Sequence, residues 1–469
     1  MSAIGSADAK SGLTSQERPS ALFPLPFTPF EYYYWSDDSP EYPKVFPVDL
    51  RFSGNLDETA FRSAVRAAQL RHPLLTALVD DSGALPRWVN ADDLHPLVDW
   101  AGETDPITHP DGAFIDLRRE VGLRVWVRTS PAATRVVVQI HHACCDGLGC
   151  LQFLEDLFLC YVAALGTDAQ AIPLPELDAD RLCRRGHFVA TENPHPTLRI
   201  ALRDISIMTW QWSSILLRRA AVLAAPGAGG CAEKTTRDLF GFASYALDGA
   251  MVRQLRLIAS GQGATLNDLL LRDMLCVLRE WNKRHERKTR GRIRFNVPVS
   301  LREKGDEALP VTNRIGFAFV TEPPQNCTDA AKQLDAVRQE MERIKQWKLG
   351  LYFLGGLALA TGVRGAVPWT LRRNQSLATM VLSNVGRAFA GWPLARRGNH
   401  IVVGNVVLER IAAVPPMRRL TRGAMVILDY ADELTISLQC DPKFFDKQQT
   451  QMLLDAYAQQ LSQTCERGT

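Results

Sequence analysis

A nearly uninterrupted apolar run over residues 135–142 constrains the fold of this chain more than any other feature. It reads RVVVQIHH, which is typical of a strand covered on both faces. The loop that follows, ACCDGLG, changes directly into a helical pattern with apolar residues at Leu154, Leu157 and Phe158. The sequence therefore predicts a buried strand, a tight turn and a helix that packs back on the sheet.

The length of the chain predicts two lobes, because 469 residues exceed what one hydrophobic core usually holds. Residues 1–22 are small and polar and are expected to form a disordered tail that lacks the apolar core of a signal peptide. Prolines punctuate the segment from about Ala171 to Pro196, where we place the boundary between lobes. We therefore expect an N-terminal lobe over residues 23–195 and a C-terminal lobe over residues 196–469.

Composition indicates an ordinary globular protein, with 46% hydrophobic residues, 22% charged residues and a formal charge of +3. The ten cysteines show no paired spacing that would indicate a disulfide framework, which favours a reducing, cytoplasmic location. The longest apolar segment, Leu349 to Val363, has fifteen residues, fewer than the roughly 20 that span a bilayer. We expect a buried helix there, and an interfacial helix is the alternative.

Strands and helices alternate in both halves, which predicts α/β or α+β layers. The first half starts with a strand near Val45, then a helix whose N-cap is Asp57, and it later forms a hairpin from Leu123 to His142. Strands of the second half are expected at residues 242–249, 292–301, 314–321, 378–386, 401–408 and 424–441, the last being a hairpin that turns through Ala431, Asp432 and Glu433.

A metal site and a cysteine nucleophile are the weaker interpretations of the histidines and cysteines after the buried strand. Side chains of adjacent strand residues point to opposite faces, so His141 and His142 do not easily share one ion, and we expect no metal. A nucleophilic thiolate needs a base that faces it. Cys144 and Cys145 are neighbours of histidines along the chain, which does not place them face to face.

A histidine base fits the pattern better. His142 shares a strand face with Val138 and Ile140 and ends the strand, where a cleft can open. An imidazole with a pKa of about 6.5 accepts a proton at neutral pH. The alternative is a pair of satisfied core histidines. Asp146 either orients the histidine or forms a salt bridge with an arginine, and Gly147 permits a turn that a side chain would obstruct.

The heptapeptide His141 to Gly147 matches the HHxxxDG signature. The chain thereby resembles the superfamily that joins chloramphenicol acetyltransferase, condensation domains of peptide synthetases, and bacterial wax ester synthase/diacylglycerol acyltransferases. RHPLL (71–75), before this motif, resembles the early helix end of condensation-like proteins. After the motif come, in order, blocks similar to the wax-synthase-like branch: ATLND (264–268), NVPVSLR (296–302), NRIGF (313–317), LSNVG (382–386) and the closing hairpin LDYADELTISLQCDP (428–442). The PLW and DFGWG blocks of some members are absent.

The resemblance implies two chloramphenicol acetyltransferase-like lobes, each a mostly mixed sheet flanked by helices, with an active-site tunnel between them. It implies transfer of an acyl group from acyl-CoA or a phosphopantetheinyl carrier protein to a small-molecule alcohol, with the thioester as co-substrate and no bound cofactor. His142 would take the proton of the acceptor. His141, Asp146 and Gly147 complete the catalytic motif.

Residues outside the motif are candidates for substrate binding. These are Asn267, Ser300, Arg302, Ser383 and Asn384. The resemblance makes Asp146 a structural carboxylate paired with an arginine, either Arg302 or Arg314. Asn267 and Asp268 have a simpler explanation as caps of a helix that starts at Leu269.

Two other functions remain open: a stand-alone condensation-type enzyme that forms an amide from a carrier-bound donor, and a non-catalytic binding module. The basic run over residues 279–294 is expected to be a solvated helix end, with coenzyme phosphates, an acidic carrier or anionic lipid as alternative partners. Nucleic acid is not expected, because no aromatic-interleaved motif accompanies the run. A helix around residues 199–219 carries arginines beside Trp210 and Trp212. We expect it to pack across the lobes, and peripheral membrane contact is the alternative.

Overall fold

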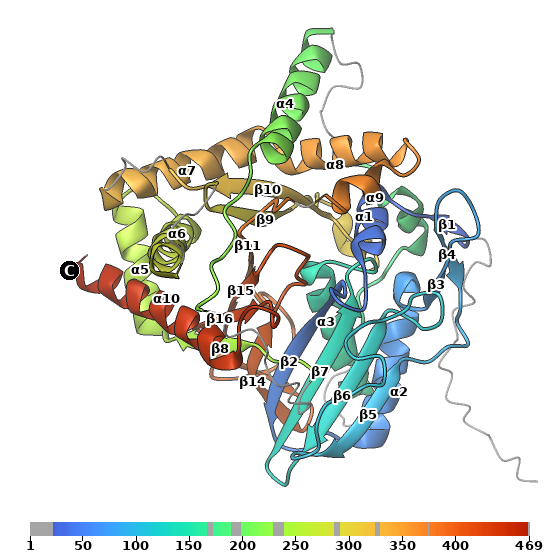
Figure 1. Ribbon diagram of the computed structural model, residues 1–469. Coiled ribbons are helices and arrows are strands. Elements are labelled where there is room, and N and C mark those ends of the chain that lie inside the picture. Colours follow the sequence, from blue (N-terminus) through green and yellow to red (C-terminus); the bar gives the residue numbers. More distant parts are fainter. Residues whose placement is uncertain are drawn as a thin grey trace, which may run out of the picture.

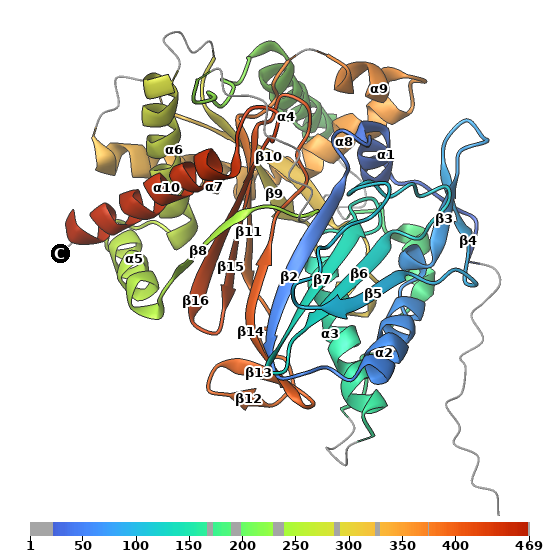
Figure 2. The ribbon, with the colours of Figure 1, turned by 60° about the horizontal axis from the view of Figure 1, so that its bottom comes forward.

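The computed structural model describes residues 22–166, 172–188, 198–227, 239–285, 291–323, 329–373 and 375–467 (Figure 1). The predicted tail, apart from residue 22, lies outside these residues, and so do residues 171 and 189–196 of the segment expected to divide the lobes. Two large sheets flanked by helices dominate the structure and confirm the expected mixed α/β fold (Figures 1 and 2).

The seven-stranded sheet contains the buried strand and the hairpin predicted from the sequence. Its strands follow the order β12-β13-β14-β2-β7-β6-β5. Their bounds are β2 Val45–Ser53, β5 Leu97–Gly102, β6 Leu123–Thr129, β7 Ala133–His141, β12 Arg396–Arg397, β13 His400–Val403 and β14 Val406–Ala413. β7 pairs antiparallel with β2 and β6, and Val136, Val138 and Ile140 are fully buried. Both predictions are confirmed.

The six-stranded sheet is built from the second half of the chain in the order β10-β9-β11-β15-β16-β8. Its strands are β8 Ala243–Leu247, β9 Arg294–Ser300, β10 Ile315–Thr321, β11 Met380–Arg387, β15 Gly423–Tyr430 and β16 Glu433–Cys440. Ala431 and Asp432 both have positive φ angles, which match the primed two-residue turn that right-twisted hairpin strands favour. The predicted closing hairpin is therefore confirmed.

The sheet pairing joins the two expected lobes, residues 23–195 and 196–469, through a strand crossover. β14 pairs with β2 from Val407 to Ala413, so residues 396–413 extend the first sheet (Figure 2). Without this crossover β2 would be an edge strand with unpaired backbone groups. The hairpin pattern of residues 401–408 predicts strands but does not say which sheet they join.

Helices cover the outer faces of both sheets and close one end of the molecule. α2 and α3 lie against the first sheet, and α5, α6, α7 and α10 lie around the second (Figures 1 and 2). The helices are α1 Pro29–Asp37, α2 Glu58–Leu70, α3 Gly147–Ala164, α4 Leu198–Leu217, α5 Gly249–Gly261, α6 Leu266–His285, α7 Ala330–Gln346, α8 Leu349–Thr361, α9 Ala366–Leu371 and α10 Lys447–Arg467. A small sheet, β1-β4-β3, is formed by Leu25–Pro26, Arg87–Asn90 and Ala77–Asp80.

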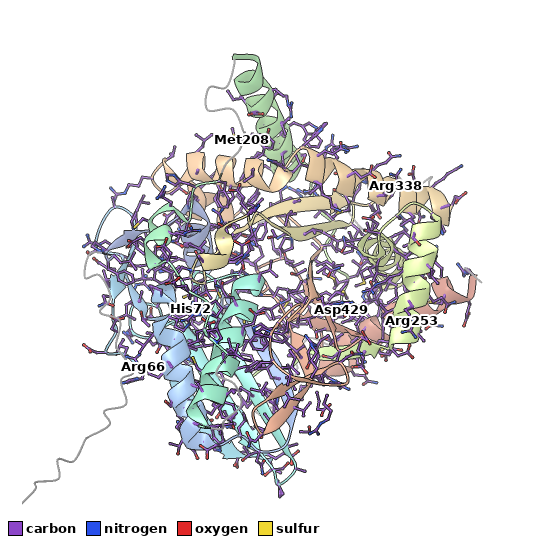
Figure 3. The ribbon with its side chains drawn as sticks, turned by 180° about the vertical axis from the view of Figure 1, so that it is seen from behind. Arg66, His72, Met208, Arg253, Arg338 and Asp429 are labelled. Atoms are coloured by element: carbon purple, nitrogen blue, oxygen red, sulfur yellow. The ribbon has the colours of Figure 1, made fainter. Side chains whose placement is uncertain are left out.

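Within the described part of the chain, α3 is long and apolar enough to cross a membrane by length and composition alone. Of the residues of this helix, 56% are buried inside the protein, which is also typical of a core helix. The RHPLL block, residues 71–75, holds α3 in place through contacts with Asp156. Arg71 Nε lies 2.6 Å from Asp156 Oδ2 on α3, and His72 Nε2 lies 3.2 Å from the same oxygen. Figure 3 shows His72 between α2 and α3.

Candidate active site

His142 follows the last residue of β7, at the junction of the two lobes. Its backbone N–H donates to the carbonyl of Lys44, at 2.7 Å. From the second lobe, the Asn313 side-chain amide donates to the carbonyls of His142 and Ala143, at 2.8 and 3.0 Å. The histidine backbone is therefore held from both lobes.

The imidazole of His142 is held by aromatic rings. Tyr34 of α1 stacks on it with ring centroids 4.0 Å apart, and Phe46 of β2 meets it edge-on at 5.0 Å. The Tyr34 hydroxyl lies 3.2 Å from Nε2 of His142. Burial raises the pKa of Tyr34 well above 10, so the phenol keeps its proton, and which of the two atoms donates depends on the tautomer of the imidazole.

Burial also lowers the pKa of His142 to about 4, although the ring's own backbone carbonyl and the charge of Asp146 oppose this shift. The imidazole is therefore neutral at pH 7, with one of its two ring nitrogens unprotonated. This is the protonation state that a general base requires.

His141 points away from His142 and has a structural environment. Its Nε2 lies 3.1 Å from Asp38 Oδ2, and its Nδ1 accepts from the N–H of Ala143 at 3.1 Å. The ring is fully buried, and Asp38 also accepts from the backbone N–H of Lys44. His141 therefore fixes the loop and does not face the reacting atoms.

The two neighbouring cysteines are buried core residues. Burial raises the pKa of Cys144 and of Cys145 far above the ordinary thiol value, so neither forms a thiolate near neutral pH. The Cys144 sulfur lies close to Gly122, where a Cβ atom would approach it to 2.3 Å. Among the described residues, no group of three His, Cys, Asp or Glu side chains could hold a metal ion.

Asp146 pairs with Arg302 and is the N-cap of α3. The Arg302 guanidinium donates to both carboxylate oxygens at 2.8 and 2.9 Å, and the backbone N–H groups of Gly149 and Arg314 donate at 2.8 Å each. Burial raises the pKa of Asp146, but the charge and hydrogen bonds of these donors outweigh it, so the pKa lies below its usual value. The sequence left two roles open for Asp146, orienting the histidine or forming a salt bridge with an arginine. The structure shows the salt bridge.

The expected caps of α6 are corrected. The helix begins at Leu266, and Thr265 is its N-cap: the Asp268 N–H donates to the Thr265 hydroxyl, and the Thr265 N–H donates to the Asp268 carboxylate. Asp268 thus belongs to a capping box, with the acidic partner three residues after the cap. Asn267 caps nothing, and its side-chain oxygen accepts from Asn384 at 3.0 Å.

A cavity of about 210 Å³ lies at the junction of the lobes, with His142 in its wall. Gly147, Ser300, Ser383 and Asn384 line it as well, so the structure brings these sequence candidates together. Asn267 and Arg302 do not line the cavity: Asn267 hydrogen-bonds to Asn384, and Arg302 forms a salt bridge with Asp146. His141 and Asp146 are absent from the lining, in agreement with their structural contacts.

One wall of the cavity carries charges that the sequence analysis missed. Asp37 lies 3.4 Å from Lys44 Nζ and 3.3 Å from an Arg418 nitrogen, and all three residues line the cavity. Tyr33 and Tyr34 belong to the same wall. The run FEYYYWSDD, residues 30–38, concentrates aromatic and acidic residues and was the available signal.

A second, apolar pocket of about 50 Å³ adjoins the first. Both are lined by Tyr33, Asn296, Phe317, Val381 and Arg418. The far wall comes from α4, α8 and α9 and includes Trp212, Phe353, Leu357, Ala360 and Leu371. The Trp212 and Phe353 rings stack 5.1 Å apart. The two spaces together can hold a polar reacting group near His142 and an apolar chain beyond it.

The fold and this site define a protein with the architecture of condensation domains. The first condensation domain of the calcium-dependent antibiotic synthetase superposes with a TM-score of 0.66, at 14% identity over 94% of this chain and 97% of that domain. The X-domain from teicoplanin biosynthesis gives 0.60 at 16% identity, covering 96% of both chains. The epimerization domain from the third module of tyrocidine synthetase B gives 0.61 at 16% identity, over 95% of this chain and 98% of that one.

Sequence comparison finds relatives of low identity. An uncharacterized protein of Mycobacterium tuberculosis is 23% identical over 386 residues, which are 78% of this chain and 85% of that protein. A linear gramicidin synthase protein of Brevibacillus parabrevis is 27% identical over 196 residues, which are 38% of this chain and 2% of that synthase protein. No family model matches the sequence.

Proposed function

We propose that this protein is an acyltransferase that moves an acyl group from a thioester to an alcohol, with His142 as general base. The observation that carries the proposal is the imidazole in the wall of the cavity between the lobes, which its lowered pKa keeps neutral at pH 7. The condensation-domain fold supports it, and so does the apolar pocket that adjoins the cavity.

The proposed reaction is a direct transfer. Nε2 of His142 takes the proton of the acceptor hydroxyl as its oxygen attacks the thioester carbonyl carbon. The tetrahedral oxyanion then collapses, the carbon–sulfur bond breaks, and the departing sulfur receives the proton from the imidazolium. Burial of the ring disfavours the imidazolium, which favours return of the proton to the leaving group.

The polar side chains around the cavity have proposed roles in binding. Ser300, Ser383 and Asn384 are placed to offer hydrogen bonds to the oxyanion or the acceptor. The donor is acyl-CoA or a phosphopantetheinyl carrier protein, used as a co-substrate in the cytoplasm. Arg302 acts through Asp146 on the position of the loop.

Release of free thiol tests this function. The purified protein is supplied with acetyl-, octanoyl- and palmitoyl-CoA and a panel of alcohols and amines, and products are identified by mass. We expect acceptor-dependent thiol release that falls by about 10²-fold or more in His142→Ala, as removal of a general base does. His95→Ala is the matched control, because His95 is exposed.

A condensation-type enzyme that forms an amide is the second candidate, favoured by the likeness to peptide synthetase domains and to linear gramicidin synthase. Turnover with amines and an acylated carrier, and none with acyl-CoA, would select it. Absence of turnover with every donor, with ligand binding unchanged in His142→Ala, would instead select a binding module and contradict catalysis.

A further inference from the structure

The helices that close the apolar pocket expose an unusual group of large apolar side chains, which we call the indole face. It consists of Ile205, Trp210, Leu217, Trp347, Leu359, Val363 and Trp369. The three exposed tryptophans of the described residues all belong to it, and Leu217 is 78% and Trp369 66% exposed. These residues lie on α4, α8, α9 and the end of α7, at the top of Figure 1.

The helices that carry the indole face contact one another. Trp210 of α4 and Trp347 meet with ring centroids 6.3 Å apart. The Tyr352 hydroxyl of α8 donates to Asp204 of α4 at 2.6 Å. The N-terminal part of α4 projects beyond the body of the molecule, where Met208 marks it in Figure 3. The exposed apolar side chains are therefore carried by helices that pack together.

Basic side chains predominate around the indole face, and Asp204 of α4 is an acidic residue within it. Residues 205–227 and 347–373 contain no aspartate or glutamate. They contain six exposed basic residues: Arg218, Arg219, Lys348, Arg364, Arg372 and Arg373. The Arg373 guanidinium lies over the Trp369 ring, 5.4 Å from its centroid. Exposed indoles among arginines are the pattern that inserts at the interface of a bilayer with anionic headgroups.

The inner side of the same helices is the far wall of the apolar pocket. Trp212, Leu357 and Val367 line the pocket from α4, α8 and α9. Ala360, Thr370 and Leu371 line it too and are only half-buried, so the wall is thin at this end. A chain held at the indole face would therefore lie close to this half-buried end of the pocket.

We propose that the indole face docks on an anionic lipid bilayer and passes an acyl chain from it into the apolar pocket. The passage of the chain rests on the proposed acyltransferase function, and the docking does not. Exposed indoles beside arginines favour an anionic bilayer, where the rings insert at the level of the headgroups, over an acidic protein surface. Single exposed apolar residues elsewhere, such as Leu257 and Met452, need no partner.

Vesicle sedimentation tests the docking. The full chain is spun with vesicles of phosphatidylcholine and with vesicles of equal parts phosphatidylcholine and phosphatidylglycerol. We expect binding to the anionic vesicles about tenfold tighter or more, and weaker in high salt. Trp210→Ser with Trp369→Ser should reduce binding about tenfold, and Arg372→Gln with Arg373→Gln should reduce the preference for anionic lipid.

The control pair Leu257→Ser with Met452→Ser removes equally exposed apolar side chains from α5 and α10 and should bind like wild type. Equal loss in this pair would overturn the proposal, and so would wild-type protein that stays in the supernatant with both vesicles. Binding of an acidic carrier protein without binding of vesicles would assign the face to a protein and overturn it too. Thiol release from soluble butyryl-CoA without vesicles tests the proposed function separately.

Discussion

The Asp146 carboxylate at the start of α3 forms a two-pronged ion pair with Arg302, which follows β9 in the other sheet. The two oxygen–nitrogen distances are 2.8 and 2.9 Å. Two backbone N–H groups, one from each lobe, complete the shell around the carboxylate. The HHxxxDG loop is therefore anchored to both lobes by a charge that lies close to His142.

Replacement of Asp146 by asparagine is expected to destabilise the fold by about 3 kcal/mol, because it leaves Arg302 without its partner and loses charge-assisted hydrogen bonds. This loss of stability lies near the lower end of the range for buried ion pairs, because the Arg302 side chain is 24% exposed and water can partly solvate it. Urea unfolding at pH 7 measures the change in the free energy of unfolding.

Asp335→Asn is the matched control, because it breaks an exposed pair with Arg338 and should cost less than about 1 kcal/mol. The pKa of Asp146 is depressed in the fold, so its stabilisation is complete above the unfolded value of about 3.9 and is lost only as the pH falls through the lower folded pKa. Equal stability of wild type and Asp146→Asn at pH 7 would contradict the structural role.

The pH profile reports the His142 base directly. Because burial lowers its pKa to about 4, kcat/KM should stay level as the pH falls from 8 to about 5 and should drop only near pH 4. Asp146 stays ionised across this range, since its own pKa lies below the usual value. Stopped assays with circular dichroism at each pH separate titration from unfolding. A midpoint near 6.5 would mean that the ring is solvated in the free enzyme.

The Tyr34 hydroxyl occupies the place at Nε2 that the acceptor hydroxyl needs. Tyr34→Phe keeps the stacked ring and removes this competing hydrogen bond, which is worth about 0.5–1.5 kcal/mol. We expect the KM for the acceptor to fall about 2–10-fold with kcat little changed. A tenfold loss of kcat would show instead that Tyr34 takes part in proton transfer. Tyr32→Phe, on the same helix and outside the cavity lining, is the control.

Local patterns of the sequence predicted most of what surrounds His142. The apolar run before the histidines requires a doubly covered strand, and the glycines after Asp146 allow the turn into α3. The resemblance pointed to an arginine partner for Asp146 and left Arg302 and Arg314 as equals. The structure uses both: the side chain of Arg302 and the backbone N–H of Arg314. Two donors from one loop cannot be separated by spacing alone.

Local sequence patterns could not predict the contacts between segments that lie far apart along the chain. Tyr34 meets His142 across 108 residues, and nothing in the spacing of FEYYYWSDD says which tyrosine turns inward. The crossover of β14 to β2 likewise depends on which sheet edge is free, a property of the assembled fold. Thr265 became the cap of α6 instead of Asn267 because the helix starts one residue after it, and helix ends are poorly fixed by pattern.

The apolar pocket should set the length of the acyl chain. Ala360 lines it from α8, and Ala360→Phe would fill much of its 50 Å³. We expect kcat/KM for palmitoyl-CoA to fall about tenfold or more, because the distal methylenes lose buried contact worth about 0.8 kcal/mol each. Acetyl-CoA should react as with wild type. Ala358→Phe adds the same ring on the exposed side of the same helix and should leave kcat/KM unchanged for both substrates. Equal losses for both donors in Ala360→Phe would place the chain elsewhere in the molecule.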